Sequence, residues 1–173
     1  LLSVSETNFN NCGTQGTVVV SYAKEIKFSD SHLIFDQAVN ERSARGLAFY
    51  LTSSSISTKI EHCTFVNCYF SSGGGIYIKY TDQGPSSSEL LLDDCSFEGT
   101  LANSGAVMYL DICSPPTLKS IKAIKCRGSN NIILIKYTNS VENTEFESCT
   151  FEENQLTSSN DGGGSGISIS LTQ

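Results

Sequence analysis

A repeated two-part motif is the feature of this sequence that most restricts its fold. The clearest copy spans residues 63–80, CTFVNCYFSSGGGIYIKY. Its first half recurs along the chain as apolar-x-x-[Cys/Ser/Thr]-x-[Phe/Leu]. The fourth positions of these copies are residues 7, 31, 63, 95, 126 and 149, which lie 24, 32, 32, 31 and 23 residues apart. Repeats of roughly 20–50 residues are typical of solenoid proteins.

The second half of the motif is a small residue followed by an alternating strand. Its copies cover residues 16–20, 46–51, 74–78, 105–109, 131–135 and 165–169. Short strands of one repeat cannot bury their apolar face alone, so equivalent positions must stack along one axis. Parallel strands joined by crossovers are almost always right-handed. We therefore predict an all-β chain folded as a right-handed parallel β-helix of about six coils. A β-sandwich is the alternative fold, but it does not explain corner residues that recur in this order.

Size and charge narrow the class of protein. The 173 residues suit a single β-helix domain, residues 1–173. The net charge of −7, without a Lys/Arg stripe, excludes nucleic acid as an expected partner. No run approaches the roughly 18 apolar residues of a membrane span. The chain starts without Met, ends inside a strand and shows no obvious cap. We therefore expect either a segment of a longer chain or a fibre subunit whose copies stack.

Cysteine and phenylalanine are predicted to form ladders inside the coil stack. Four cysteines occupy the fourth position of the motif, and phenylalanine follows two residues later in three of these copies. The predicted core ladder is Cys63, Cys95, Cys126, Cys149, Phe65, Phe97 and Phe151. We expect buried thiols, although rungs about 4.8 Å apart would also permit a disulfide such as Cys63–Cys95. The odd total of seven cysteines excludes a closed set of internal disulfides. Cys12, Cys68 and Cys113 are expected to be unpaired.

The two motifs together resemble those of a known group of repeats. Phe151-Glu152-Glu153-Asn154 matches an FxxN motif, and Gly74-Gly75-Ile76-Tyr77 and Gly105-Ala106-Val107-Met108 are similar to a GGA[I/V/L] motif. Their alternation resembles the polymorphic outer-membrane-protein repeats of chlamydial autotransporter passengers. It also resembles Cys-rich versions in surface proteins of some protists and, more broadly, the pectin-lyase-like β-helix superfamily. The resemblance implies an extracellular or cell-surface rod for adhesion or assembly, with no catalytic residues to transfer.

One face of the second-half strands is the best candidate for an interface. If Ile76 and Ile78 point inward, Tyr77 must point outward. The predicted outward column is Val19, Phe49, Tyr77, Met108, Leu134 and Ser168, of which Val19, Phe49, Tyr77, Met108 and Leu134 are apolar or aromatic. Such a stripe suggests a lateral contact with a protein partner or a second copy. A loop of the same chain, such as 81–89, is the alternative cover.

A second candidate site is an acidic corner just before the Cys/Ser/Thr position. Its members are Glu6, Asp30, Glu61, Asp93, Asp94 and Glu147. Carboxylates one rung apart can share Ca²⁺, which makes Glu61, Asp93 and Asp94 weak candidates for a calcium site. A solvated corner that keeps the rod soluble is the favoured interpretation. We therefore expect no metal and no cofactor.

A carbohydrate-active β-helix, either a polysaccharide lyase or a glycoside hydrolase, is the alternative function. Glycoside hydrolysis needs two carboxylates across a cleft. The only adjacent acid pairs, Asp93-Asp94 and Glu152-Glu153, fall near predicted turns. His32 and His62 fit no catalytic or metal pattern and are expected at the surface. We expect no enzyme but a structural or adhesive rod, extracellular or at the cell surface, that self-associates or binds a protein, with a glycan as a further possible ligand.

Overall fold

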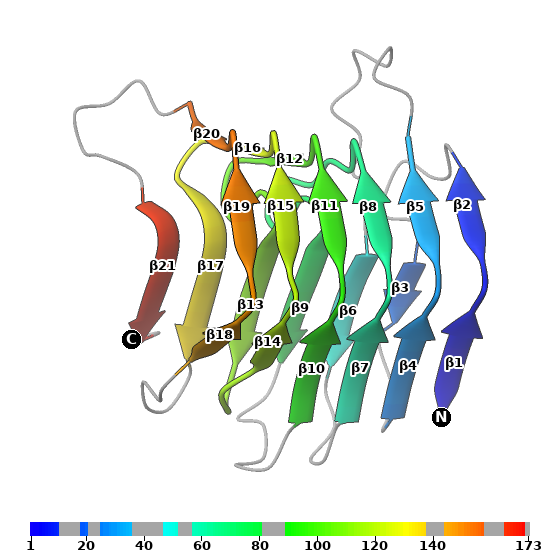
Figure 1. Ribbon diagram of the computed structural model, residues 1–173. Coiled ribbons are helices and arrows are strands. Elements are labelled where there is room, and N and C mark those ends of the chain that lie inside the picture. Colours follow the sequence, from blue (N-terminus) through cyan, green and yellow to red (C-terminus); the bar gives the residue numbers. More distant parts are fainter. Residues whose placement is uncertain are drawn as a thin grey trace.

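Strands of successive repeats stack into four parallel sheets in the computed structural model of the chain (Figure 1). The structure describes residues 1–10, 18–20, 25–35, 47–51, 57–80, 89–137, 144–157 and 165–171. Within these ranges every paired strand runs parallel to its neighbour, and no helix is present. The predicted all-β parallel solenoid is confirmed.

Three of the sheets have six strands and one has three. Sheet 1 consists of β1 (Leu2–Ser5), β4 (Glu25–Ser29), β7 (Ser57–Glu61), β10 (Glu89–Asp93), β14 (Thr117–Lys119) and β18 (Glu145–Glu147). Sheet 2 consists of β2 (Asn8–Asn10), β5 (His32–Ile34), β8 (Thr64–Val66), β11 (Ser96–Glu98), β15 (Lys122–Ile124) and β19 (Thr150–Glu152). The short sheet 3 consists of β12 (Leu101–Ala102), β16 (Arg127–Gly128) and β20 (Gln155–Leu156). Sheet 4 consists of β3 (Val18–Val20), β6 (Leu47–Leu51), β9 (Ile76–Tyr80), β13 (Met108–Ile112), β17 (Asn131–Tyr137) and β21 (Ser165–Leu171).

The path of the chain through these sheets is right-handed. Strands of sheets 1 and 2 rise at the front of Figure 1, and those of sheet 4 descend behind them. Successive repeats, numbered here as coils 1 to 6 from their sheet 1 strand, advance from the N-terminal right side to the C-terminal left side. Rising in front, descending behind and advancing leftward is a right-handed turn, as expected for parallel crossovers.

The core consists of columns of like side chains, one from each coil. In sheet 2, Phe65 pairs with Phe97 in register, and their rings stack with centroids 4.7 Å apart and an interplanar angle of 6°. Both rings are fully buried. Phe151 continues the column beyond Ala123 but lies at its end, with 37% of its surface exposed. The predicted phenylalanine ladder therefore exists, and its burial falls off at the last coil.

Each turn from sheet 1 into sheet 2 is made by a single residue in the left-handed region. These residues have φ between 48° and 55° and are Glu6, Asp30, His62, Asp94, Ser120 and Ser148. Residues other than glycine are strained by roughly 1–2 kcal/mol in this left-handed conformation. The backbone N–H of the corner residue nevertheless stays in the ladder, as from His62 to the Asp93 carbonyl at 3.0 Å. The stacked coils thus hold the corner in a conformation that one coil alone would not keep.

The Cys/Ser/Thr position of the motif lies just after this corner, and its chemistry explains the preference. Its side chain donates a hydrogen bond to the carbonyl two residues earlier, from Ser31 Oγ at 2.7 Å, Cys63 Sγ at 3.1 Å and Cys95 Sγ at 3.4 Å. Each of these carbonyls also accepts a backbone N–H from the neighbouring coil, so the side chain supplies its second hydrogen bond. Thiols are weak donors, but they bury as readily as an apolar group. The residue therefore satisfies the corner and fills the core at once.

Cys126 does not belong to this column, which corrects the predicted ladder. In register, Cys95 is followed one coil later by Ile121, because Asp93 pairs with Lys119 and Ser96 pairs with Lys122. Cys126 lies instead at the next corner, where its backbone N–H donates to Asn154 Oδ1 at 2.9 Å and its thiol donates to the Ile124 carbonyl at 3.4 Å.

Six cysteines lie in the described part of the chain. They are Cys63, Cys68, Cys95, Cys113, Cys126 and Cys149, and none of them is in a disulfide. All are buried except Cys149, which is partly exposed at the last coil. Cys12 lies outside the described residues.

Candidate interaction surfaces

The outward column of sheet 4 differs from the predicted one in two coils. Tyr77 pairs with Tyr109, which pairs with Leu134 and then Ser168. Met108 pairs with Ile76 instead and is fully buried, so its predicted place on the outer face is wrong.

The N-terminal part of the same column is shifted as well. Phe49 pairs with Ile78, whereas the partner of Tyr77 is Ala48. Val19 pairs with Ala48 and so keeps its predicted backbone register, although side chains in β3 and β6 lie outside the described part. Leu134 retains its place in the column but is only 8% exposed. The outer face of sheet 4 therefore presents Tyr77 and Tyr109 in the middle coils.

Aromatic rings form a short row on this face. Phe70 stacks on Tyr77 with centroids 6.2 Å apart, and Tyr77 stacks on Tyr109 at 5.0 Å. The Lys136 ammonium lies 5.5 Å from the centre of the Tyr109 ring, within range of a cation–π contact. Both tyrosines are partly exposed. The row offers flat, amphipathic rings of the kind enriched at interfaces.

A charged row runs beside the aromatic one. Asp111 pairs in register with Lys79 and with Lys136. Partial burial raises the pKa of the Asp111 carboxyl, and the two lysines oppose that shift. Because the folded pKa is above the unfolded one, the stability linked to this group is full at low pH and is lost as the pH rises through the folded pKa.

Asp111→Asn is therefore expected to remove part of the pH dependence of stability. The stability of the wild type relative to this variant should fall as the pH is raised from below the ordinary aspartate pKa of 3.8 to neutrality. Urea unfolding of both proteins at several pH values measures the difference. Lys136→Met should strengthen the dependence, because it removes an opposing charge. A difference that grows with rising pH would contradict this assignment.

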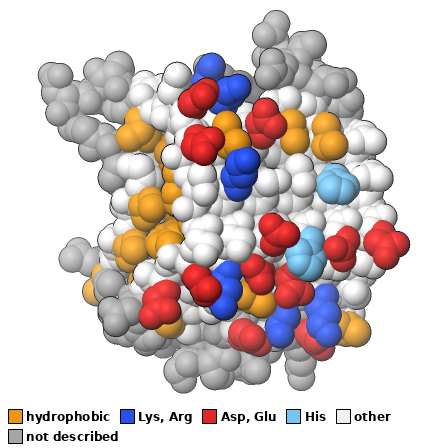
Figure 2. All heavy atoms as spheres, viewed as in Figure 1, with side chains coloured by type: hydrophobic (Ala, Val, Ile, Leu, Met, Phe, Trp, Pro, Cys, Tyr) orange, Lys and Arg blue, Asp and Glu red, His pale blue; other side chains and the backbone are white. Residues whose placement is uncertain are grey.

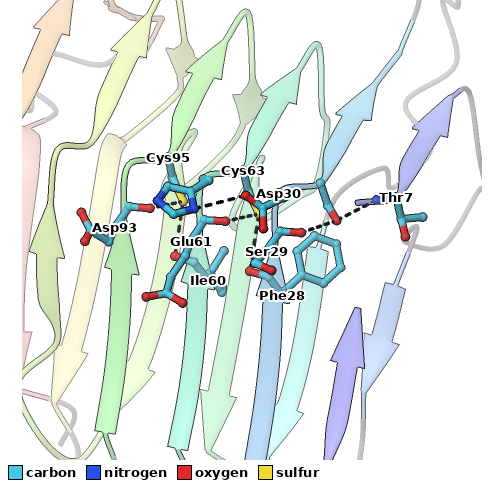
Figure 3. Close-up of polar contacts among 11 residues, drawn as sticks. Thr7, Phe28, Ser29, Asp30, Ile60, Glu61, Cys63, Asp93 and Cys95 are labelled. Carbon is cyan, nitrogen blue, oxygen red and sulfur yellow. Dashed lines mark hydrogen bonds and ion pairs between the residues drawn. The ribbon is translucent and has the colours of Figure 1, made fainter. Parts of the chain in front are cut away.

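The acidic corner is two columns rather than one. Glu61 and Asp93 pair in register at the end of sheet 1, where Lys119 and Glu147 continue the column. Asp94 lies in the neighbouring corner column, which also holds Asp30 and His62. His62 Nδ1 is 3.2 Å from Asp30 Oδ1 (Figure 3). Lys119 Nζ is 3.0 Å from Glu147 Oε2. These pairs are solvent-exposed and contribute little to stability.

No group of three or more His, Cys, Asp or Glu is placed to hold a metal ion within the described ranges. His32 and His62 are both exposed, as expected from the sequence. The acid pair Glu152-Glu153 lies at the turn that follows sheet 2, which is the second corner of the coil. There Glu153 lines a polar groove of about 480 Å³ together with Lys125, Arg127, Asn154 and Gln155. Lys125 Nζ is 3.9 Å from Glu153 Oε2 across this groove.

The C-terminal end of the stack carries a group of exposed apolar side chains. Inward-facing positions of the last coil have no further coil above them in the structure, and five large side chains there are 37–47% exposed: Phe151, Leu156, Ile167, Ile169 and Leu171. Figure 2 shows hydrophobic side chains grouped at the left edge, which is this end. The strands β18, β19, β20 and β21 are each the last of their sheet, so one edge of each has no strand beside it in the described part. Open edges of this kind are templates for a further strand.

Comparison with known proteins gives no match. No protein-family model fits the sequence, and no curated protein or solved structure is detectably similar to it. Across the residues described, there is no helix long and apolar enough to cross a bilayer.

Sequence patterns predicted open ends of the coil stack but did not reveal which apolar side chains are exposed there. At the N-terminal end Leu2, Val4 and Phe9 are partly buried against the core. At the C-terminal end Phe151, which lies in the column of Phe9, is 37% exposed, whereas Phe146, in the column of Val4, is partly buried. Counting the inward positions of the last coil in the correct register would have identified this surface.

Proposed function

We propose that the chain is a non-catalytic structural β-helix of the cell exterior that works by association with other protein, as a self-assembling fibre subunit or a surface adhesin rod. The observation that supports this most directly is the apolar C-terminal end with its open strand edges. Repeat arrays bury such ends under a cap or a further coil, which either the same protein or a second copy can supply. The resemblance of its motifs to chlamydial passenger repeats supports the extracellular placement.

The register favours head-to-tail stacking between copies. If coil 1 of a second copy follows coil 6, Val4 stands beside Phe146 and Phe9 beside Phe151, which continues two apolar columns. The outward positions of the junction are also compatible, because Glu145, Glu147 and Glu152 then face Ser3, Ser5 and Asn10 rather than carboxylates.

Tail-to-tail contact is disfavoured by charge. It would bring the glutamates of β18 and β19 from both copies together at one junction. Head-to-tail contact joins two different surfaces, and such contacts propagate into open filaments unless they close into a ring.

Replacing Ile167 and Ile169 with serine is expected to weaken association roughly tenfold or more. These residues are 40% and 41% exposed, and burying that surface contributes about 1 kcal/mol each. Sedimentation velocity over a concentration series measures the change. Ile34→Ser is the matched control, because Ile34 is 41% exposed but lies on the side of the rod in β5. Ile34→Ser should assemble like the wild type.

The outcome separates an end contact from a lateral one. If Tyr77→Ser with Tyr109→Ser lowers association and the Ile167/Ile169 variant does not, the contact is lateral, along sheet 4. A wild-type chain that stays monomeric at its highest soluble concentration would refute self-assembly.

A carbohydrate-active β-helix is the alternative, and the aromatic row on sheet 4 is the observation that favours it. The partly exposed rings of Phe70, Tyr77 and Tyr109 form an aromatic surface on which a sugar ring could pack. Release of unsaturated sugars from polyuronates by the purified chain would establish this function in place of the structural one.

A further inference from the structure

Two buried thiols lie on neighbouring rungs in the middle of the rod. Cys63 follows the first corner of coil 3 and Cys95 follows that of coil 4, and the strands on both sides pair in register. The two backbones are joined at this point, since Ser96 N donates to the Cys63 carbonyl at 2.9 Å. Both side chains point into the core and are only 1% exposed. Figure 3 shows the two cysteines side by side at the corner.

We propose that Cys63 and Cys95 form a disulfide that links coil 3 to coil 4 when the chain folds in the presence of an oxidant such as a small-molecule disulfide. Parallel rungs lie about 4.8 Å apart, which is within the Cα separation that a disulfide spans. The Cα separation of the two rungs therefore permits the bond. This inference is independent of the proposed function, because it concerns one chain and not its assembly.

The protonation of the two thiols is linked. The hydrogen bond with Cys95 lowers the pKa of the Cys63 thiol. The same hydrogen bond, together with burial, raises the pKa of Cys95. Cys63 is therefore the thiol that becomes the thiolate first, and thiolate is the nucleophile in disulfide exchange.

The other cysteines at the described corners lack such a neighbour. Thr100 occupies the rung between Cys68 and Cys126, and Ile121 occupies the rung between Cys95 and Cys149. A separation of two rungs, about 10 Å, exceeds the reach of a disulfide. The register thus selects one pair from the cysteines that stand at these corners.

The reaction with oxidised glutathione balances in two exchanges. The Cys63 thiolate attacks one sulfur of glutathione disulfide, which releases one reduced glutathione and leaves a mixed disulfide. The Cys95 thiolate then attacks the Cys63 sulfur and releases the second glutathione. The two protein thiols lose two electrons and two protons in total. Both sulfurs are buried in the closed fold, so the exchange takes place during folding, after the two corners have come together and before the core closes over them.

The test is refolding of the reduced chain in a glutathione buffer, followed by unfolding in guanidinium chloride that contains iodoacetamide and mapping of chymotryptic peptides. The expected product has Cys63 linked to Cys95, with Cys68, Cys113, Cys126 and Cys149 alkylated. Reduction should then lower the melting temperature by roughly 5–10 °C. Alkylation of both Cys63 and Cys95, or a link from either one to another cysteine, would overturn the proposal.

Serine variants provide the controls. Cys63→Ser and Cys95→Ser should each abolish the link and the effect of reduction on melting, while serine still donates to the corner carbonyl. The double variant Cys68→Ser with Cys126→Ser should keep the disulfide and the effect of reduction on the melting temperature. Far-UV circular dichroism tests whether each variant is folded. If a serine variant does not fold, the peptide map of the wild type still shows whether Cys63 and Cys95 are linked.

Discussion

Replacing Phe97 with alanine is expected to lower the free energy of unfolding by about 3–5 kcal/mol, the range for a fully buried phenylalanine. The ring lies in the middle of its column, 1% exposed, with Phe65 stacked 4.7 Å below it. It also fills the space left by Gly75, since a Cβ at that glycine would lie 2.6 Å from the ring. Alanine would leave a cavity lined on several sides by the backbone of neighbouring coils, which cannot collapse easily.

Phe151→Ala is the matched control for this prediction. Phe151 belongs to the same column but lies at the C-terminal end, where 37% of its surface is exposed. Its loss should cost no more than about 2 kcal/mol in the monomer. Urea unfolding monitored by circular dichroism, at concentrations where the chain is monomeric, compares the two variants. Equal losses would mean that burial along the column is uniform, contrary to the structure.

The stacking of coils could be predicted from the sequence because its cause is repeated in every coil. The inward side chain after the first corner fills the core and, at Ser31, Cys63 and Cys95, also donates to a carbonyl. The alternation of Ile76, Tyr77 and Ile78 likewise fixes which side of sheet 4 faces inward, and Ile76 and Ile78 are fully buried.

The register of the fifth coil could not be read from residue types alone. Both corners of a coil place an inward donor two residues after a carbonyl, so Cys126 at the second corner looks like Cys63 at the first. Ile121 occupies the first corner without any side-chain donor, and nothing in the sequence marks it. The positive φ of Ser120 and Lys125 shows that coil 5 turns at both places.

The outward face of sheet 4 was misplaced by one residue for a related reason. The left-handed turn before this sheet is made by Gly73, with φ of 71°, and by Gly105, with φ of 63°. Before sheet 4 the sequence has three consecutive glycines in coil 3, Gly73 to Gly75, but a single glycine, Gly105, in coil 4. Only the first of the three, Gly73, matches Gly105 in register. Aligning the wrong glycine moves Met108 from the core to the surface. Backbone conformation, rather than glycine content, defines the register.

Gly74 lies where coils 3 and 4 approach each other closely. Gly74→Ala is expected to destabilise the fold by about 3 kcal/mol or more. A Cβ at Gly74 would lie 2.2 Å from the Ala106 carbonyl oxygen and 2.8 Å from that of Leu101, both in the backbone of the next coil. Coil 4 would have to move away, which would disturb the hydrogen bond from Gly74 N to the Gly105 carbonyl at 3.0 Å. The expected result is a large fall in the urea midpoint with the β-sheet spectrum retained.

Gly166→Ala provides the comparison, because Gly166 lies in β21 of sheet 4 and a Cβ added there would have no atom within 4 Å. Alanine there restricts the unfolded chain without a clash, so it should be neutral or stabilising by up to about 1 kcal/mol. The contrast isolates the steric cost of contact between coils from the intrinsic cost of replacing glycine. Equal effects of the two substitutions would show that coils 3 and 4 do not approach each other this closely.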